Sequence, residues 1–352
     1  MLAVALVGAG VMGSVHGRNF MTFGDRARVA CVFDPDLDKA SFLAGEVGAV
    51  VSRSLEDALS EQEVNAVAVA VPPTHHQAIV EMALDRGKHV FLEKPIATNR
   101  AQAEAILELS RHTDRQVMVG HVLRFWPGYP EVHELVVGGT LGSPLSISCF
   151  RMQPPPSKVG WLADVEVTGG IAPLVLIHDF DLMNWVFGSP EAVHSIALQG
   201  EGPGAPHVAV GVRYATGAGV VEGSVSLPTS HPFSTRISVY CEEASVHYGY
   251  DVPPALGSTQ RDANQFSPAS QPVISIYRSD GKPGDTIPIS ATNVWRPELE
   301  HFVTCVERNE PIENGTPDQA MAALEVALAA NLSLSTGERI AIGPGAGAGR
   351  SD

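Results

Sequence analysis

The 352-residue chain has few cysteines and few aromatic residues, and it has no long apolar run. Its four cysteines (Cys31, Cys149, Cys241 and Cys305) are far apart and form no CxxC pair. This spacing argues against a zinc site or a disulfide scaffold, predicts no metal site, and favours a reducing compartment. No stretch of about 18 uncharged apolar residues occurs, and the apolar start lacks a basic flank. We therefore expect a soluble, cytoplasmic protein with no membrane span.

Basic side chains are also scarce. Lys and Arg number 23 against 39 Asp and Glu, a formal net charge of −16 at pH 7. Nucleic acids and anionic membrane surfaces both need a basic face, so neither is an expected partner. With 44% hydrophobic and 18% charged residues, the chain can bury a sizeable core, and its length fits two domains.

The first 120 residues alternate between strand-like and helix-like segments. The predicted strands are Leu2–Val7, Arg28–Phe33, Ala66–Val71, Lys88–Phe91 and Val117–Val119. The predicted helices are Asp36–Ala44, a short one starting at Ser54, Thr74–Arg86 and Asn99–Arg111. Repeated strand–helix–strand units with right-handed crossovers predict an open parallel sheet.

Beyond about residue 123 the pattern changes to short β-rich segments separated by Gly or Pro, which predicts an antiparallel or mixed sheet. These segments are Ser143–Phe150, Glu191–Leu198, Val208–Arg213, Gly219–Ser226 and Thr235–Tyr240. Helices are predicted over Pro173–Phe187, Val294–Arg308 and Pro317–Leu334. Residues 251–272 are typical of a long polar loop.

A glycine motif follows the first predicted strand and opens the first predicted helix. Gly8-Ala9-Gly10-Val11-Met12-Gly13 has the spacing G-x-G-x-x-G. The first glycine permits a tight turn, the second lets the backbone approach a pyrophosphate, and the third allows close packing of helix on strand. Phosphates then lie at the helix N-terminus. We predict that Gly8, Gly10, Val11, Met12 and Gly13 bind a dinucleotide.

An acidic residue completes this motif, because Asp34 comes 21 positions after Gly13, at the end of the second predicted strand. A carboxylate there accepts hydrogen bonds from the adenosine ribose and repels a 2′-phosphate, which predicts NAD rather than NADP. Lys39 is expected to be a solvated helix residue. The alternative is a glycine turn with a solvent-facing aspartate, and the order of strand, glycines, helix, second strand and acid disfavours it.

Further segments carry a family resemblance. They read Val71-Pro72-Pro73-Thr74-His75-His76, Gly87-Lys88-His89-Val90-Phe91-Leu92-Glu93-Lys94-Pro95, Gly120-His121-Val122-Leu123-Arg124-Phe125-Trp126-Pro127, Thr168-Gly169-Gly170, Ile177-His178-Asp179-Phe180-Asp181, and a late helix with Trp295, Leu299 and Phe302. Together they closely resemble the glucose–fructose oxidoreductase/inositol dehydrogenase (Gfo/Idh/MocA) family over essentially the whole chain. The Glu-Lys-Pro and His-Asp-x-Asp motifs are fairly specific in combination.

The resemblance implies an α/β protein with two domains and a tail. Residues 1–122 would form an NAD-binding Rossmann domain with a doubly wound parallel sheet. Residues 123–340 would form a substrate-binding α/β domain whose open, largely antiparallel sheet makes a homo-oligomer, a dimer or tetramer. Residues 341–352 would be a flexible tail. The implied reaction is reversible hydride transfer between the nicotinamide and a secondary alcohol of a sugar, cyclitol or related polyol.

Two catalytic roles follow from the resemblance. In family members the lysine of Glu-Lys-Pro bonds the reacting oxygen, and the histidine on the second-domain helix is the acid/base. Those roles fall on Lys94 and His178. The chemistry supports them, because oxidation of an alcohol needs a base for the hydroxyl proton and a donor for the developing negative oxygen. A solvated loop lysine and a structural helix histidine remain the alternatives.

The remaining candidates line the expected site. His76 and Glu93 match family positions at the cofactor, and Pro72 and Lys94 are further candidates for binding it. Arg124 is a candidate at the edge of the substrate pocket, with packing at the domain junction as an equal alternative. Trp161 precedes the Gly-Gly loop and is a candidate for substrate contact.

One position departs from the family pattern. Well-known members carry an Asp four residues before the active-site histidine, and here that residue is Leu174. Asp181 is three residues after His178 and shares its helix face, whereas Asp179 points about 100° away. We predict that Asp181 takes over the contact with substrate or with His178.

Two alternative functions stay open, and the departure at Leu174 motivates the first of them. A catalytically impaired NAD(H)-binding regulatory protein is one alternative to a dehydrogenase or keto-reductase. Another is an enzyme that retains NAD and uses it for transient oxidation.

Overall fold

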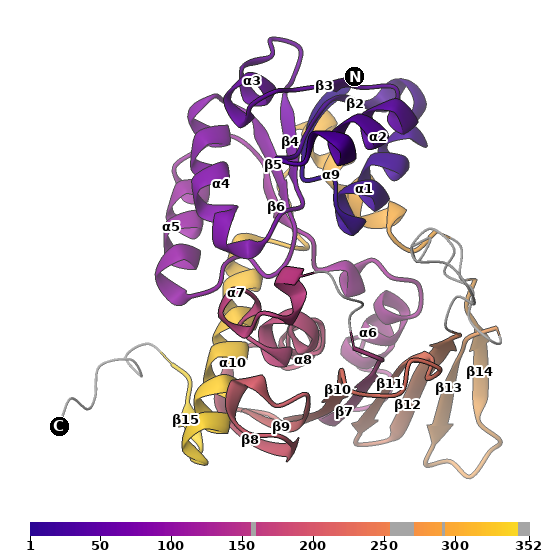
Figure 1. The fold of residues 1–352 in the computed structure, drawn as a ribbon. Helices are drawn as coiled ribbons and strands as arrows, with labels where there is room; N and C mark the ends of the chain where they lie inside the picture. Colours follow the sequence, from indigo (N-terminus) through magenta and orange to yellow (C-terminus); the bar gives the residue numbers. More distant parts are fainter. Residues whose placement is uncertain (156–159, 254–270, 291–292, 344–352) are drawn as a thin grey trace. The chain divides into compact units, whose positions relative to one another are not determined.

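The computed structural model describes residues 1–155, 160–253, 271–290 and 293–343. This part of the chain divides into two compact units (Figure 1). The first contains Met1–Trp126 and Asn293–Met321, and the second contains residues 127–155, 160–253, 271–290 and 322–343. No helix among the described residues is both long enough and apolar enough to cross a bilayer.

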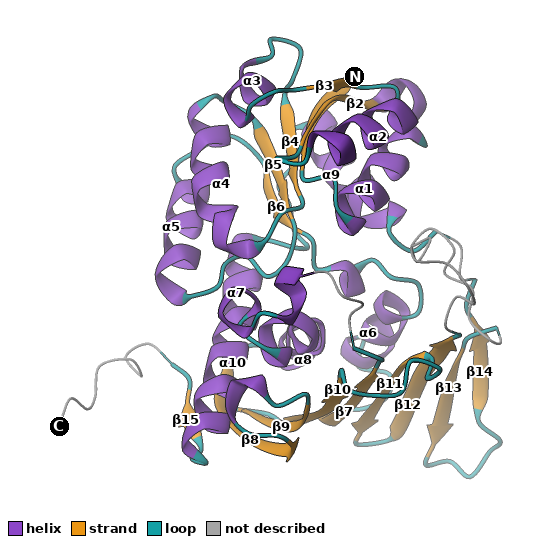
Figure 2. Ribbon diagram, viewed as in Figure 1, coloured by secondary structure: helices purple, strands orange, loops and turns teal. Residues whose placement is uncertain are grey.

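A parallel sheet forms the centre of the first unit (Figure 2). Its strands are β1 (Leu2–Val7), β2 (Ala27–Phe33), β3 (Val50–Val51), β4 (Ala66–Val69), β5 (His89–Leu92) and β6 (Val117–Val119). Its helices are α1 (Val11–Met21), α2 (Leu37–Val47), α3 (Leu55–Ser60), α4 (His76–Asp85), α5 (Arg100–Arg111) and α9 (Arg296–Arg308). The order β3-β2-β1-β4-β5-β6 reverses between β1 and β4, where open sheets of this kind bind ligands. The predicted doubly wound parallel sheet is confirmed.

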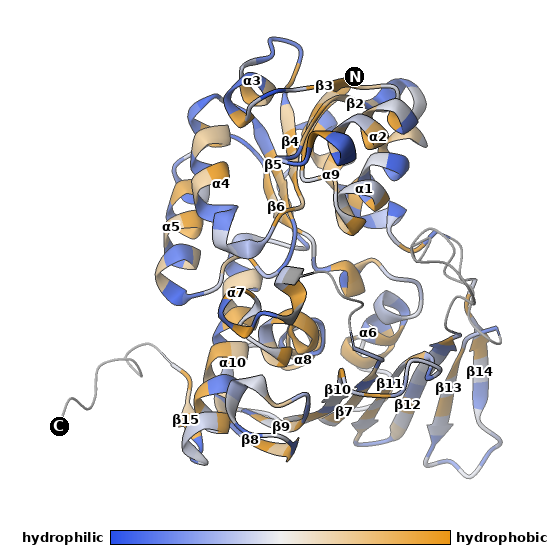
Figure 3. Ribbon diagram, viewed as in Figure 1, coloured by the Kyte–Doolittle hydropathy of each residue, from blue (hydrophilic) through white to orange (hydrophobic). Residues whose placement is uncertain are grey.

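Local sequence explains where these elements begin. All six side chains of β1 are buried, as a central parallel strand requires, and Figure 3 shows hydrophobic colouring along much of this sheet. The Ser54 hydroxyl accepts the Asp57 N–H at 3.0 Å and so caps α3. The Asn99 side-chain oxygen accepts the Gln102 N–H at 3.0 Å and caps α5. Such caps satisfy helix N–H groups that have no partner within the helix.

Helix α9 belongs to the core of the first unit, although it follows the second unit's strands in the chain. Its Leu299, Phe302 and Val303 are buried in the same cluster as β1 and β2. The ring of Phe302 also packs edge-on against Phe91 of β5, with centroids 5.8 Å apart. The predicted domains, 1–122 and 123–340, do not place α9 in the first unit. Sequence alone does not show which core an amphipathic helix covers.

A mixed sheet forms the second unit, in the order β14-β13-β12-β11-β7-β10-β9-β8-β15. Strand β10 pairs with β7 in parallel and the other neighbours pair antiparallel, so the predicted open, largely antiparallel sheet is confirmed. The strands are β7 (Pro144–Met152), β8 (Pro190–Gln199), β9 (His207–Tyr214), β10 (Ala218–Ser224), β11 (Phe233–Cys241), β12 (Ala244–Val252), β13 (Val273–Arg278), β14 (Asp285–Pro288) and β15 (Ile340–Ala341). Helices α6 (Tyr129–Val137), α7 (Val165–Thr168), α8 (Ile177–Phe187) and α10 (Pro317–Thr336), the last of which starts in the first unit, lie on one face of the sheet (Figure 1).

Several elements of the second unit differ from the sequence expectation. Helices α6 and α7 and strands β12 to β15 were not predicted. The predicted helix over Pro173–Phe187 is continuous, but Ala172–Leu176 is a wider, π-helical turn that leads into α8. Most of the polar stretch 251–272, and all but the first few residues of the expected tail 341–352, lie outside the described residues.

Candidate functional site

The glycine loop lies between β1 and α1, at the carboxyl end of the sheet. Gly8 has φ +101°, and a Cβ there would stand 2.3 Å from the Ala70 carbonyl oxygen, so only glycine fits. A Cβ on Gly13 would stand 1.9 Å from the Gly8 carbonyl oxygen, which explains the close approach of α1 to the loop. Gly10 is different, because a Cβ there would meet no described atom within 4 Å. The open space at Gly10, beside the exposed N-terminus of α1, fits a bound pyrophosphate.

Asp34 lies beside this loop at the end of β2. One carboxylate oxygen accepts the Ala9 N–H at 2.8 Å, and the other accepts the Asp36 N–H at 2.9 Å. The side chain therefore holds the glycine loop and keeps its negative charge next to it. Lys39 pairs with Asp36 at 2.9 Å on the exposed start of α2, as expected of a solvated helix residue.

Lys94 and Glu93 follow β5 at the same edge of the sheet. Glu93 is buried, and one of its carboxylate oxygens lies 2.6 Å from Nε2 of His16 in α1. Its other oxygen accepts the Lys94 backbone N–H at 3.1 Å. Burial opposes ionisation of Glu93, but the hydrogen bond and charge of His16, together with Lys94, outweigh it, and the pKa of Glu93 is lowered. His16 was not among the residues predicted from the sequence, and its position on α1 is the one signal that could have suggested it.

His76 joins two loops of the cofactor edge. Its ring is fully buried, with Nε2 3.1 Å from the Val71 carbonyl oxygen and Nδ1 3.2 Å from the Ile96 carbonyl oxygen. Burial lowers the pKa of His76, which favours the neutral ring. His76 thus connects the loop after β4, which contains the partly exposed Pro72, to the loop that carries Lys94.

Arg124 also belongs to the first unit. Its side chain is buried, and its guanidinium donates to the Asn314 side-chain oxygen at 3.4 Å. This contact fits the packing alternative for Arg124, and its role at the substrate stays a prediction.

His178 and Leu174 lie in the second unit, on the helical stretch that ends in α8. Both are half-buried, whereas most of their neighbours in this stretch are buried. Leu174 lies in the π-helical turn, a feature that often occurs at functional sites. Asp181 is buried, and its charge is one of the causes, after burial and Cys149, that raise the pKa of Tyr214 well above its usual value. The proposed contact of Asp181 with substrate or His178 stays a prediction.

Asp179, next to His178, has a structural partner. Its carboxylate accepts two hydrogen bonds from Arg151 of β7, at 2.6 Å from Nε and 3.1 Å from Nη2. Both side chains are buried, with 4% exposure for Arg151 and 0% for Asp179. This ion pair ties α8 to the sheet. This ion pair was not predicted from the sequence, because its partners are 28 residues apart.

Trp161 lies in a short 3-10 helix, Gly160–Ala163, and is half-buried. Asp164 follows it and caps α7 by accepting the Glu166 N–H at 2.9 Å. The substrate contact predicted for Trp161 stays a prediction.

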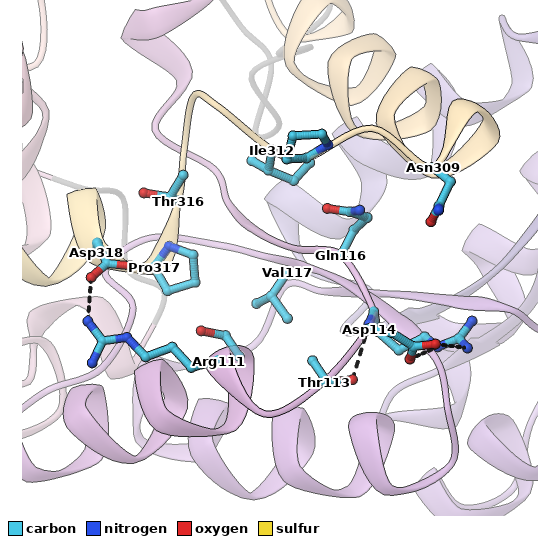
Figure 4. Close-up of a pocket in the computed structure, with 13 residues that line it drawn as sticks. Arg111, Thr113, Asp114, Gln116, Val117, Asn309, Ile312, Thr316, Pro317 and Asp318 are labelled. Atoms are coloured by element: carbon cyan, nitrogen blue, oxygen red, sulfur yellow. Dashed lines mark hydrogen bonds and ion pairs between the residues drawn. The ribbon is translucent and has the colours of Figure 1, made fainter.

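A cavity of about 440 Å³ opens elsewhere in the first unit, at the amino end of β6 (Figure 4). Its charged side chains are paired with one another: Arg111 with Asp318 at 2.7 Å, and Arg115 with Asp114 at 2.9 Å. Ligands of open α/β sheets bind at the opposite, carboxyl ends of the strands. We therefore assign the cavity no part in the site.

The first unit has the features of a Rossmann-type dinucleotide-binding oxidoreductase. Residues 2–121 match the family described as "Oxidoreductase family, NAD-binding Rossmann fold", and residues 129–247 match the GFO/IDH/MocA C-terminal domain. The chain belongs to the Gfo/Idh/MocA oxidoreductase family. The resemblance seen in the sequence is confirmed.

Curated relatives include inositol dehydrogenases. The scyllo-inositol 2-dehydrogenase (NAD(+)) of Bacillus subtilis is 27% identical over 351 residues, which cover 95% of this chain and 94% of that protein. The inositol 2-dehydrogenase of Leifsonia xyli is 32% identical over 192 residues, 54% of this chain and 55% of that protein. The chain thus spans about half the length of the Leifsonia protein in this match.

Solved structures share the fold along nearly the whole chain. An oxidoreductase from Desulfitobacterium hafniense, described as NADPH-dependent, has a TM-score of 0.83 at 17% identity and covers 97% of both chains. A protein described as a myo-inositol dehydrogenase from Sinorhizobium meliloti has a TM-score of 0.78 at 24% identity and covers 97% of this chain and 100% of that one. At these identities the likeness shows the fold alone.

Proposed function

We propose that the protein is an NAD(H)-dependent oxidoreductase that transfers hydride between nicotinamide and a secondary alcohol or ketone of a sugar, cyclitol or related polyol. The observation that carries this proposal is the edge of the first sheet, where the glycine loop, Asp34 and Lys94 follow β1, β2 and β5. The Bacillus subtilis relative, named as an NAD(+)-dependent inositol dehydrogenase and matched along 95% of this chain, supports the substrate class.

Each proposed role follows from ordinary chemistry. The glycine loop, Val11 and Met12 would hold the pyrophosphate through backbone N–H groups at the start of α1. When bound, the nicotinamide supplies the hydride acceptor or donor. Lys94 would donate a hydrogen bond to the reacting oxygen and stabilise the negative charge that develops there. His178 would take the hydroxyl proton during oxidation and return it during reduction.

A substrate panel tests the reaction. Purified protein is incubated with NAD and each of several inositols, hexoses and nucleotide sugars, and with NADH and their keto forms, while NADH absorbance is followed. We expect turnover with at least one polyol or its ketone. Bound nicotinamide that survives purification without net NADH production would favour the NAD-retaining enzyme instead. Nucleotide binding with no turnover on the whole panel would favour the impaired regulatory protein.

Cofactor preference depends on Asp34. We expect a preference for NAD over NADP of about a hundredfold or more in kcat/KM, because a 2′-phosphate beside a carboxylate costs roughly a few kcal/mol. Asp34→Asn removes the charge and keeps one oxygen for the Ala9 N–H. It loses only the acceptor of the exposed Asp36 N–H, so it should narrow the preference without unfolding the loop. Steady-state kinetics with both cofactors measure this. Equal efficiency of the wild type with NAD and NADP would contradict the proposal.

The uncovered face of the second sheet is proposed as the homo-oligomer interface. Val220 of β10 and Tyr240 of β11 are 44% and 45% exposed, and Tyr277 of β13 is 56% exposed. Strand pairing places Tyr240 and Tyr277 in one cross-strand row, because both align with Ser245 of β12. Exposed apolar and aromatic side chains gathered on one face favour association.

Charge placed on this face should dissociate the oligomer. We expect Val220→Arg combined with Tyr240→Glu to shift the mass measured by light scattering to that of one chain. The control is Phe42→Lys on α2, an equally apolar site that is 62% exposed on the first unit, which should leave the mass unchanged. A wild type that is already monomeric would contradict the proposed interface.

A further inference from the structure

Glu298, in the first turn of α9, has no part in the function proposed so far. Its side chain is buried, with 1% exposure. Among the described residues, neither of its carboxyl oxygens has a hydrogen-bond partner. A buried polar group left in this state costs free energy, so a carboxyl group at this position calls for an explanation beyond packing.

The carboxyl group points to the cofactor edge of the first sheet. Its Oε2 lies 3.7 Å from the position that a Cβ on Gly120 would take, and the Leu92 carbonyl oxygen lies 3.6 Å from the same point. Leu92 ends β5 and Gly120 follows β6. Glu298 therefore lies at the strand ends from which Glu93 and Lys94 extend, and it interacts electrostatically with both.

Burial and the neighbouring charged groups decide the protonation of Glu298. Glu93 and Lys94 lie on the loop after β5. His16 of α1 is bonded to Glu93, and the buried His121 follows β6. Burial first, and then the negative charge of Glu93, raise the pKa of Glu298 well above its usual value, while Lys94 lowers it less. Burial and the charge of Glu93 therefore both favour the uncharged form of Glu298, whereas His16 and Lys94 favour the ionised form of Glu93.

We propose that Glu298 is a positioning residue for Lys94: its uncharged form lets the ammonium reach the reacting oxygen, and its ionisation adds a second carboxylate that draws the ammonium back. This inference rests on the oxidoreductase function proposed above. Two carboxylates compete for one ammonium strongly in a buried site, where charges are poorly screened.

The first test compares pH profiles of kcat, with the best substrate of the panel, from about pH 6 to pH 10. Glu298→Gln keeps the shape and cannot ionise. We expect its alkaline decline to lie at least half a pH unit above that of the wild type. The matched control is Glu300→Gln on the same helix, where Glu300 pairs with Arg296 and is 40% exposed; it should follow the wild type. Coincident profiles for Glu298→Gln and wild type would overturn the proposal.

A second test uses unfolding and needs no substrate. Because the folded pKa of Glu298 is raised, its contribution to stability is complete below the unfolded pKa of about 4.3 and is lost as pH rises toward the folded pKa. Glu298→Gln has no such loss. The folding equilibrium constant of Glu298→Gln, divided by that of the wild type, should therefore rise with pH between these two pKa values, by up to about tenfold per pH unit. A ratio that does not change with pH would show that Glu298 is ionised in the fold and overturn the proposal.

A third measurement decides on the wild type alone and therefore does not need a folded Glu298 variant. The infrared C=O stretch of a protonated carboxylic acid should be present near neutral pH in the wild type and in Glu300→Gln. If Glu298→Gln folds, the stretch should be absent from it. Its absence from the wild type would overturn the proposal. Neither this band nor the unfolding result depends on turnover, so failure of the substrate panel would contradict the proposed function without deciding the state of Glu298.

Discussion

Replacing Lys94 with alanine is expected to lower kcat by about a hundredfold or more while leaving the affinity for NADH nearly unchanged. The ammonium would donate to an oxygen whose negative charge develops in the transition state, so its removal acts on turnover more than on binding. Its backbone N–H, bonded to Glu93, is retained in the variant. Steady-state kinetics give kcat, and NADH fluorescence titration gives the cofactor affinity.

The control for this variant is Lys282→Ala in the second unit, since Lys282 is 79% exposed on its side chain and pairs only with Asp280 among the described residues. It should behave as the wild type in both measurements. Collapse of NADH binding in Lys94→Ala, with turnover at saturation maintained, would identify Lys94 as a cofactor clamp and reject its proposed role at the reacting oxygen.

The second large effect concerns the stability of the second unit. We expect Asp179→Ala to lower the free energy of unfolding by about 3–5 kcal/mol, because it leaves the buried Arg151 guanidinium without its partner. Burial opposes the charge of Arg151, but Asp179 and other neighbouring groups outweigh it, and the pKa of Arg151 is raised. Chemical denaturation followed by circular dichroism measures the loss.

Two comparisons separate this buried ion pair from an ordinary one. Asp251→Ala breaks the exposed Arg236–Asp251 pair of the same unit and should cost at most about 1 kcal/mol. The double variant Arg151→Met with Asp179→Leu replaces both charges by apolar groups and should recover most of the stability lost in Asp179→Ala. Equal losses from Asp179→Ala and Asp251→Ala would contradict the assigned role of the buried pair.

The ion pair also matters for function, because Asp179 is adjacent to His178 in the chain. Anchoring α8 to β7 limits how far the proposed acid/base can move. The motif His178-Asp179-x-Asp181 therefore combines two tasks. Helix geometry already placed Asp179 and Asp181 on different faces, but it did not reveal the Arg151 partner of Asp179. Asp179 maintains the structure, whereas His178 and Asp181 are proposed to act in the reaction.

Local pattern was enough to predict the glycine loop and the first sheet, apart from its two-residue edge strand β3. Buried strands such as Leu2–Val7 are continuous apolar runs, and capping residues such as Ser54 and Asn99 act within three positions of themselves. The order from Gly8 to Asp34 likewise depends on neighbours along the chain. Signals of this kind are local, so periodicity, capping and spacing carry them without knowledge of the fold.

Tertiary structure decided what depends on partners far apart in the chain. The His16–Glu93 bond joins residues 77 positions apart, and the Arg151–Asp179 pair joins residues 28 apart. Helix α9 reads as an ordinary amphipathic helix, yet packing places it in the first unit and brings Glu298 to the ends of β5 and β6. The burial that raises the pKa of Glu298 comes from the assembled core, because desolvation depends on every group that surrounds a carboxyl and not on the residues beside it in the sequence.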